Sequence, residues 1–215
     1  MKIIKPVKAT HLLGSKASKK DPKFDVFETK NFLSERLIYQ EKIDGFPIAV
    51  SFDKDGGLII KHLGKALPSA VATAVKKWVH AKEAMLLNYL GDDFVLHGEW
   101  MKERQTVFYD NLPSPFIAVD IFDKENEVYL CLERLDQFCS LAQVVPAPTI
   151  IAGVFNVEDV ARWALQPSKF GSEQVEGIYV RMDDEFRTIS RAQYVSERGD
   201  SSHKNKTNTI RSEDA

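Results

Sequence analysis

The chain has 215 residues, of which 44% are hydrophobic and 28% are charged. This composition is typical of an ordinary folded protein and excludes disorder throughout. A chain of this length builds one sizeable core or at most two small ones, so we expect one domain and exclude elaborate multidomain machinery. The formal net charge of −2 also excludes a protein that coats nucleic acid through a uniformly basic surface.

Positive charge is concentrated at the N-terminus. Residues 1–30 hold eight lysines against three acidic residues. A basic arm of this kind can contact phosphates, and a solvated lysine face is the alternative. Charge alone leaves both interpretations open.

The sequence shows neither a signal peptide nor a membrane span, and its two cysteines are not arranged as a metal site. Residues 1–6 lack the apolar core of a signal peptide, and no stretch approaches the roughly 18 apolar residues that a membrane span needs. We therefore expect a cytoplasmic location. Cys131 and Cys139 have no further cysteine and no nearby histidine to complete a metal site, so we expect reduced, buried thiols.

Hydrophobic patterning predicts strands and helices in irregular alternation. Segments 37–43, 47–52 and 58–61 are rich in β-branched and aromatic residues, and Asp55-Gly56-Gly57 supplies the turn of a hairpin between the last two. In residues 67–90, apolar side chains recur at three- and four-residue steps, which predicts one long amphipathic helix. The later elements are strands at 94–97, 116–122, 128–130, 177–182 and 186–195, and helices at 132–142 and 157–165.

This order of elements favours an α+β fold. A regular parallel βαβ repeat is not visible, so the sheets should be mainly antiparallel and flanked by helices. The 20 residues after Val195 are mostly polar and lack periodicity, which indicates a C-terminal tail or a final irregular element.

One lysine and several acidic residues stand at the ends of predicted strands. Lys42 closes the first strand just before Asp44-Gly45, although surface lysines before glycine turns are common and the pentapeptide alone is weak evidence. What strengthens the signal is the order of the groups that follow. These are Glu99 in Gly98-Glu99-Trp100, Asp120 in an apolar strand, Glu176 before Gly177, and Arg191 and Gln193 in the last strand.

This order resembles motifs I, III, IIIa, IV and V of the covalent nucleotidyltransferases, the superfamily of ATP-dependent ligases and mRNA capping enzymes. The resemblance covers residues 42–195 and is closest to the RNA ligase family. The further segments that carry it are His11-Leu12, Gly14-Ser15, Tyr109-Asp110-Asn111-Leu112-Pro113 and Tyr194-Val195. The resemblance implies a nucleotidyltransferase domain over residues 1–195, a polar tail over 196–215 and no appended oligonucleotide-binding (OB-fold) domain.

The resemblance implies an ATP-dependent RNA ligase that seals 5′-phosphate and 3′-hydroxyl ends through a lysyl-adenylate. Lys42 would be the nucleophile, and it must first lose a proton, because an unperturbed lysine has a pKa of about 10.4. Arg191 would be its catalytic partner. Glu99 and Glu176 would bind Mg²⁺ or Mn²⁺, since hard oxygen ligands suit these ions. RNA ends and ATP would be the partners of a monomer.

The resemblance also implies a set of nucleotide-binding residues. Bland alternatives stay open for several of them: a solvent-facing carboxylate at Glu99 or Glu176, a structural hydrogen-bonding role for Asp120, and a solvated charge at Lys61. The full set is Glu41, Lys42, Asp44, Gly45, Lys61, Glu99, Val119, Asp120, Glu176, Arg191 and Gln193. Softer candidates are His62 and Lys65 in place of Lys61, His11 and Ser15 for packing or phosphate contact, and Arg181 and Arg187 for phosphates.

Two positions depart from the family pattern. Val119 stands where the family often has an aromatic side chain that stacks on adenine, and an aliphatic residue lacks a stacking face. Gln193 stands where motif V usually provides a lysine opposite the α-phosphate, so charge neutralisation there is weaker. These departures leave an alternative open: a degenerate relative that binds nucleotide or RNA without ligating. Motif I alone does not separate ATP from GTP.

Overall fold

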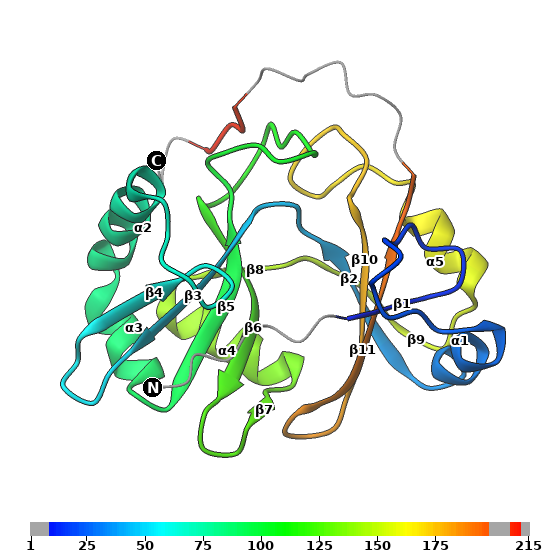
Figure 1. Cartoon of the computed structure of the whole chain (residues 1–215), viewed down its shortest axis with the longest axis horizontal. Coiled ribbons are helices and arrows are strands. Elements are labelled where there is room, and N and C mark those ends of the chain that lie inside the picture. Colours follow the sequence, from blue (N-terminus) through cyan, green and yellow to red (C-terminus); the bar gives the residue numbers. More distant parts are fainter. Residues whose placement is uncertain (1–8, 198–206, 212–215) are drawn as a thin grey trace.

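The computed structural model describes residues 9–197 and 207–211 and arranges them around two β-sheets that stand side by side (Figure 1). The first sheet has the strand order β1-β11-β10-β2-β9, and its neighbours run antiparallel except for the parallel pair β1 and β11. Its strands are β1 Thr10–His11, β2 Leu37–Lys42, β9 Thr149–Gly153, β10 Gly177–Asp183 and β11 Thr188–Val195.

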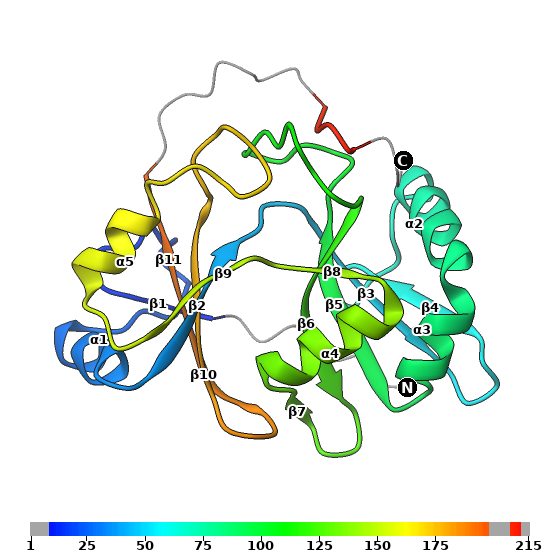
Figure 2. The ribbon, with the colours of Figure 1, turned by 180° about the vertical axis from the view of Figure 1, so that it is seen from behind.

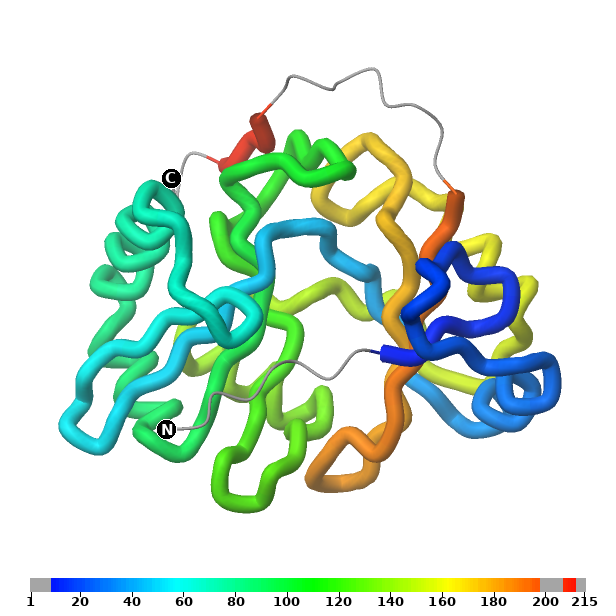
Figure 3. Tube along the Cα trace, viewed as in Figure 1, coloured from blue at the N-terminus to red at the C-terminus, as the bar shows by residue number. Residues whose placement is uncertain are grey.

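The second sheet has the order β4-β3-β5-β6-β7, with β8 pairing in parallel with β6. Its strands are β3 Phe46–Phe52, β4 Leu58–Lys61, β5 Phe94–Trp100, β6 Phe116–Asp123, β7 Val128–Tyr129 and β8 Val145–Pro146. The chain crosses from the first sheet to the second directly after Lys42, where β2 leads into β3 (Figure 3). Mainly antiparallel sheets flanked by helices confirm the predicted fold class.

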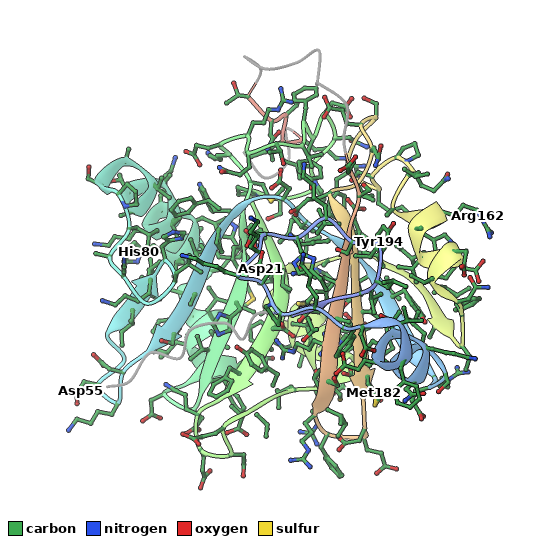
Figure 4. The ribbon with its side chains drawn as sticks, turned by 45° about the vertical axis from the view of Figure 1, so that its right-hand side comes forward. Asp21, Asp55, His80, Arg162, Met182 and Tyr194 are labelled. Carbon is green, nitrogen blue, oxygen red and sulfur yellow. The ribbon has the colours of Figure 1, made fainter. Side chains whose placement is uncertain are left out.

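Each sheet has its own helices and its own core. The helices α1 Val26–Leu33 and α5 Val157–Trp163 pack on the first sheet, whereas α2 Ser69–Ala81, α3 Glu83–Leu90 and α4 Leu132–Ala142 pack on the second (Figures 1 and 2). His80 on α2 and Arg162 on α5 lie on opposite flanks of the molecule (Figure 4). With the outer faces covered, the inner faces of the two sheets are left to form a site between them.

The short helices begin where the sequence caps them. Asp25 accepts a hydrogen bond from the Glu28 N–H at the start of α1, and the Glu28 carboxylate accepts one from the Asp25 N–H. Asn156 and Asp159 form the same reciprocal pair at the start of α5. Such a capping box satisfies two backbone N–H groups that a helix end otherwise leaves unpaired.

The single long helix predicted over residues 67–90 is wrong, because the segment forms two helices that meet at Lys82. Lys82 has φ −121° and therefore leaves the helical region. The break lets Val79 of α2 and Leu86 of α3 both reach the core with no exposed surface. Periodicity missed it, since the apolar spacing continues across the junction. The prediction also missed α1, β1, β8 and β9, whereas the predicted buried, free Cys131 and Cys139 are confirmed.

The described C-terminal residues 207–211 pack on the loop that follows β5. Ile210 forms a parallel bridge with Leu112, and the Leu112 N–H donates to the Thr209 carbonyl at 3.0 Å. The domain boundary at residue 195 stays a prediction, because most of 196–215 lies outside the described residues. Among the helices that the structure describes, none combines the length and the apolar character that crossing a membrane requires.

Candidate functional site

A cleft lies between the two sheets, and residues from both sheets line it. The predicted site residues divide into two groups at this cleft. Those that line it are Glu41, Lys42, Glu99, Val119, Asp120, Arg191 and Gln193. Those outside the lining are Asp44, Gly45, Lys61 and Glu176. The structure therefore brings most of the set together from segments that are far apart in the sequence.

Lys42 stands at the end of β2 and is held by Glu176. The pairing of β2 with β10 places Lys42 opposite Gly177, so that Glu176 comes just before the neighbouring strand. The Lys42 Nζ donates to the Glu176 Oε2 at 2.5 Å. Both side chains keep some exposure, 25% for the lysine and 19% for the glutamate. The amine is thus fixed in position and still accessible from the cleft.

Glu99 projects from β5 beside this ion pair. Its Oε2 is enclosed and has no hydrogen-bond partner among the described residues. Desolvation raises the pKa of Glu99 to about 8; Lys42 opposes this increase, and the carboxylates of Glu176 and Asp44 add to it. Glu99 therefore holds a proton at neutral pH as long as no additional cation stands beside it.

The Glu99 and Glu176 carboxylates fit the predicted site for a divalent metal ion. Within the described ranges, no group of three or more acidic, histidine or cysteine side chains could hold a metal ion. Mg²⁺ is commonly bound by one or two carboxylates together with substrate phosphates and water. An enclosed carboxylate oxygen without a partner is a group that a cation would satisfy.

Glu41 lines the cleft, and a neighbouring loop holds its carboxylate. Glu41 is 2% exposed, and its oxygens accept hydrogen bonds from the Ser168 Oγ at 2.5 Å and from the Lys169 N–H at 3.0 Å. These bonds tie the strand that carries Lys42 to a loop more than a hundred residues away. The side chain of Glu41 therefore acts as a clamp that fixes the strand of Lys42 to this loop.

Asp44 forms a second clamp on the other side of Lys42. Its Oδ2 accepts hydrogen bonds from the backbone N–H groups of Thr106 and Val107, both at 2.6 Å. The Asp44 N–H in turn donates to the Tyr109 hydroxyl at 2.9 Å. Asp44 therefore orders the loop after β5, and through it the turn that follows the lysine.

Gly45 is required by a close approach of the backbone. A Cβ at this position would lie 2.6 Å from the Met101 Sδ and 2.8 Å from the Glu99 Cβ. The neighbouring loop is supported from the C-terminal segment, since Asn208 accepts from the Tyr109 N–H at 3.0 Å and donates to the Met101 carbonyl at 2.8 Å. Gly45 thus lets the lysine turn pack directly against the strand of Glu99.

Asp120 joins the two sheets at the cleft. Its Oδ2 lies 3.1 Å from the Arg191 Nη1 and its Oδ1 lies 3.5 Å from the Arg181 Nη1. Arg191 also lies over the Tyr129 ring, 3.5 Å from its centroid. Arg181 has no exposed surface. The structural interpretation of Asp120 is supported, and Arg181 serves as a buried partner in this network and is closed to solvent phosphates.

The softer candidates near β4 lie outside the lining. Lys61 is half-buried on β4. The His62 ring stacks on Phe46 at a centroid distance of 4.1 Å, and its Nδ1 lies 2.8 Å from the Pro47 carbonyl oxygen. Only the following residues, Leu63 and Gly64, reach the cleft from this segment.

Comparison with models of protein families identifies one family. The sequence model of the RNA ligase family matches residues 35–203. The chain belongs to the RNA ligase family. No curated protein matches the sequence.

Solved structures of *Naegleria gruberi* RNA ligase share the fold. An alanine variant with ATP and Mn is 18% identical with a TM-score of 0.65, and the match covers 91% of this chain and 62% of that one. The ligase with PPi is also 18% identical, with a TM-score of 0.64 and coverage of 91% and 61%. A variant with AMP and Mn has 16% identity and a TM-score of 0.65, with coverage of 87% and 59%. The chain thus spans about three-fifths of the *Naegleria* protein.

In this RNA ligase family member, the motif V position is tied to the N-terminal segment. The Gln193 Nε2 donates to the Ala9 carbonyl at 3.2 Å and to the His11 Nε2 at 2.7 Å. With the His11 Nε2 accepting from Gln193, the proton of the neutral ring is assigned to Nδ1, which lies 2.7 Å from the Ser15 Oγ. The Ala9 carbonyl fixes the orientation of the Gln193 side-chain amide. If the amide were flipped, its Oε1 would face the Ala9 carbonyl oxygen and no hydrogen bond would form. Both amide hydrogens of Gln193 are used, and only its Oε1 is left for a ligand.

The sequence prediction missed His97 as a residue of the cleft. His97 lines the cleft from β5, pairs in register with Asp120 and is 5% exposed. Desolvation lowers its pKa to about 4, although Asp120 opposes this shift, so the imidazole is neutral at pH 7. Its position two residues before Glu99 on the same strand was the available signal, because alternate residues of a strand share a face.

Proposed function

We propose that this chain is an ATP-dependent RNA ligase that joins 5′-phosphate and 3′-hydroxyl ends through an adenylate on Lys42. The observation that carries the proposal is the accessible amine of Lys42, held by Glu176 beside Glu99 in a cleft of an RNA ligase family fold. ATP and a divalent cation also occur in the *Naegleria* ligase structures that share this fold.

The reaction proceeds in three displacements at phosphorus. The neutral Lys42 Nζ forms a bond to the α-phosphorus of ATP, and pyrophosphate leaves with the electrons of the broken P–O bond. An oxygen of the RNA 5′-phosphate then displaces Lys42 and takes the AMP. Finally, the RNA 3′-hydroxyl loses its proton, attacks the 5′-phosphate and releases AMP. Covalent relay through the lysine divides one difficult transfer into easier steps.

The residues of the cleft prepare Lys42 for this role. Glu176 accepts a hydrogen bond from Nζ and orients it. Glu99 and Glu176 would hold Mg²⁺ or Mn²⁺, which supplies positive charge to the phosphates. The clamps formed by Glu41 and Asp44 keep the lysine turn rigid.

Labelling with α-³²P-ATP and Mg²⁺ or Mn²⁺ tests the proposal. We expect the wild-type chain to retain the label on a denaturing gel and Lys42→Ala to retain none, because no other group replaces the nucleophile. Lys77→Ala, which removes an exposed lysine on α2, is the matched control and should label as wild type does. An unlabelled wild type, or undiminished label on Lys42→Ala, contradicts the proposal. Labelled GTP in parallel reveals the nucleotide preference.

The geometry of Gln193 favours one second candidate, a relative that binds nucleotide or RNA without transferring AMP. Its amide hydrogens are occupied by Ala9 and His11, so it offers a phosphate neither charge nor a donor. Such a protein would retain RNA on a filter and form no covalent nucleotide.

The substitution Gln193→Lys separates a weakened ligase from a binding protein. It returns a cation to the cleft, and we expect adenylylation of Lys42 to accelerate about tenfold, because a charged donor stabilises the developing charge on phosphorus. Single-turnover labelling measures this rate. A slower rate would show that the bonds from Gln193 to the N-terminal segment matter more than the missing charge.

A further inference from the structure

The C-terminal segment, residues 207–211, pairs along the β5–β6 loop, residues 101–115 (Figure 1). The Thr209 N–H donates to the Tyr109 carbonyl at 2.9 Å, and the Leu112 N–H donates to the Thr209 carbonyl at 3.0 Å. The loop is long and contains neither a helix nor a strand of its own. Such a loop depends on other segments to satisfy its backbone groups, so this pairing helps to order it.

Asn208 holds the β5–β6 loop at two points. Its Oδ1 accepts a hydrogen bond from the Tyr109 N–H at 3.0 Å, and its Nδ2 donates one to the Met101 carbonyl at 2.8 Å. A side-chain amide supplies this acceptor and this donor together, whereas a carboxylate would place an oxygen against the Met101 carbonyl. Asn208 therefore fixes the start of the loop, two residues after Glu99, relative to its middle.

Tyr109 carries this restraint from the loop to Lys42. Its hydroxyl accepts a hydrogen bond from the Asp44 N–H at 2.9 Å. The Asp44 Oδ2 accepts one in return from the Val107 N–H at 2.6 Å, within the same loop. Asp44 is two residues after Lys42, so Tyr109 links Asn208 to the turn that follows the lysine.

A small hydrophobic core lies beneath the same turn. Ile43 directly follows Lys42 and is 5% exposed. It shares a hydrophobic cluster with Tyr109 and Leu112, and Ile210 packs against this cluster from the C-terminal segment. Hydrogen bonds and apolar packing from the C-terminal segment thus converge on the turn after the lysine.

The loop also has support that does not involve the C-terminal segment. The Phe108 N–H donates to the Glu173 Oε2 at 3.0 Å, and the Asn111 N–H donates to the Phe170 carbonyl at 3.0 Å. These contacts remain when Asn208 is replaced. A substitution at Asn208 should therefore loosen the loop locally and leave the fold intact.

We propose that Asn208 is a positioning residue for the adenylylation of Lys42. Asn208 is not among the residues that line the cleft, and it acts through the β5–β6 loop. Attack on phosphorus requires the amine at a narrow range of distances and angles, and a displacement of about 1 Å can lower the rate by up to about a hundredfold. The inference rests on the proposed function of Lys42 and adds a residue of the C-terminal segment to it.

Single-turnover labelling of the whole chain, with α-³²P-ATP at several concentrations, separates the maximal rate from ATP affinity. Asn208→Ala should lower the maximal rate about tenfold and leave the half-saturating ATP concentration within about twofold of wild type, because no residue of the cleft changes. Asn208→Asp keeps the acceptor for the Tyr109 N–H and loses the donor to Met101, so it should also slow labelling. Asn156→Ala is the matched control. It removes the cap of α5, which destabilises the chain, and it should label at the wild-type rate.

Hydrogen exchange follows the loop without any catalysis. The amides of Asp44 and Val107 should exchange about tenfold faster in Asn208→Ala, measured relative to the amides of β10, because the bonds that protect them open more often. In Asn156→Ala these two amides should change no more than those of β10.

Three results would overturn the inference: a wild-type labelling rate in Asn208→Ala, a loss confined to ATP affinity, or an equal loss of rate in Asn156→Ala. If Asn208→Ala fails to fold, Asn208→Asp decides by the same measurements. If wild-type Lys42 takes no label, the proposed function fails, and hydrogen exchange at Asp44 then decides whether Asn208 positions the turn.

Discussion

Replacing Asp120 with alanine is expected to lower the free energy of unfolding by about 3–5 kcal/mol, the cost of removing one partner of a buried ion pair. Asp120 faces two arginines, and within the described residues Arg191 pairs with no other carboxylate. Arg181 keeps Asp183, whose Oδ2 lies 3.1 Å from its Nε. The loss therefore falls mainly on Arg191, which stays buried with an uncompensated charge. Urea denaturation measures the change.

A double substitution tests whether that charge is the cause. Asp120→Ala with Arg191→Met removes both partners, and it should recover part of the lost stability, because a buried apolar pair costs less than a buried single charge. Asp92→Ala, at an exposed aspartate, is the control and should change stability by about 0.5 kcal/mol or less. If Asp120→Ala changed the free energy of unfolding as little as this control does, the ion pairs between the sheets would contribute little to stability.

The network around Asp120 shows what the sequence could predict. A carboxylate within an apolar strand needs a partner or a role, and this rule singled out Asp120 correctly. The rule does not identify the partner. Arg181 and Arg191 lie on strands of the other sheet, and their pairing with Asp120 depends on how the two sheets face each other. That orientation is a property of the packed molecule and has no local signal.

The acidic residues beside Lys42 illustrate a second limit. The positions of Glu41 and Asp44 next to the lysine predict a role at the nucleotide, yet both carboxylates accept hydrogen bonds from loops. Glu41 accepts from Ser168, 127 positions away, and Asp44 accepts from Thr106, 62 positions away. Local patterning gives the strands and the turn, because these depend on neighbours in sequence. It gives no information on side-chain partners at such separations.

The missed elements have a local explanation. Strands β1 and β8 have two residues each, which is too short for an alternating pattern to be seen. Three of the five residues of β9 are exposed, and its neighbouring residues Ile150 and Ile151 break the polar–apolar alternation of a typical strand. The helix is interrupted at Lys82, although the apolar spacing of the sequence continues across this residue. These elements are defined by pairing and packing, and the sequence alone marks them poorly.

Glu99 should make the stability of the metal-free chain fall as pH rises, and Glu99→Gln should remove this dependence. The folded-state pKa of Glu99 is raised to about 8, mainly by desolvation. The unfolded chain ionises the group at its ordinary pKa near 4.3. Between these values the folded state binds one proton more than the unfolded state, so raising the pH favours unfolding. The wild type should lose about 1.4 kcal/mol per pH unit relative to Glu99→Gln across this window.

The same proton provides a second measurement that needs no catalysis. A cation beside Glu99 favours the ionised carboxylate, so binding of Mg²⁺ or Mn²⁺ at pH 7 should release about one proton, and Glu99→Gln should release none. Calorimetry in two buffers of different ionisation enthalpy counts that proton. Equal release by both chains would place the cation elsewhere, and a pH-independent stability difference would show that Glu99 is already ionised. Because the charge of Lys42 acts on Glu99, a cation bound at this carboxylate would also disfavour the ammonium form of Lys42, and adenylylation requires the neutral amine.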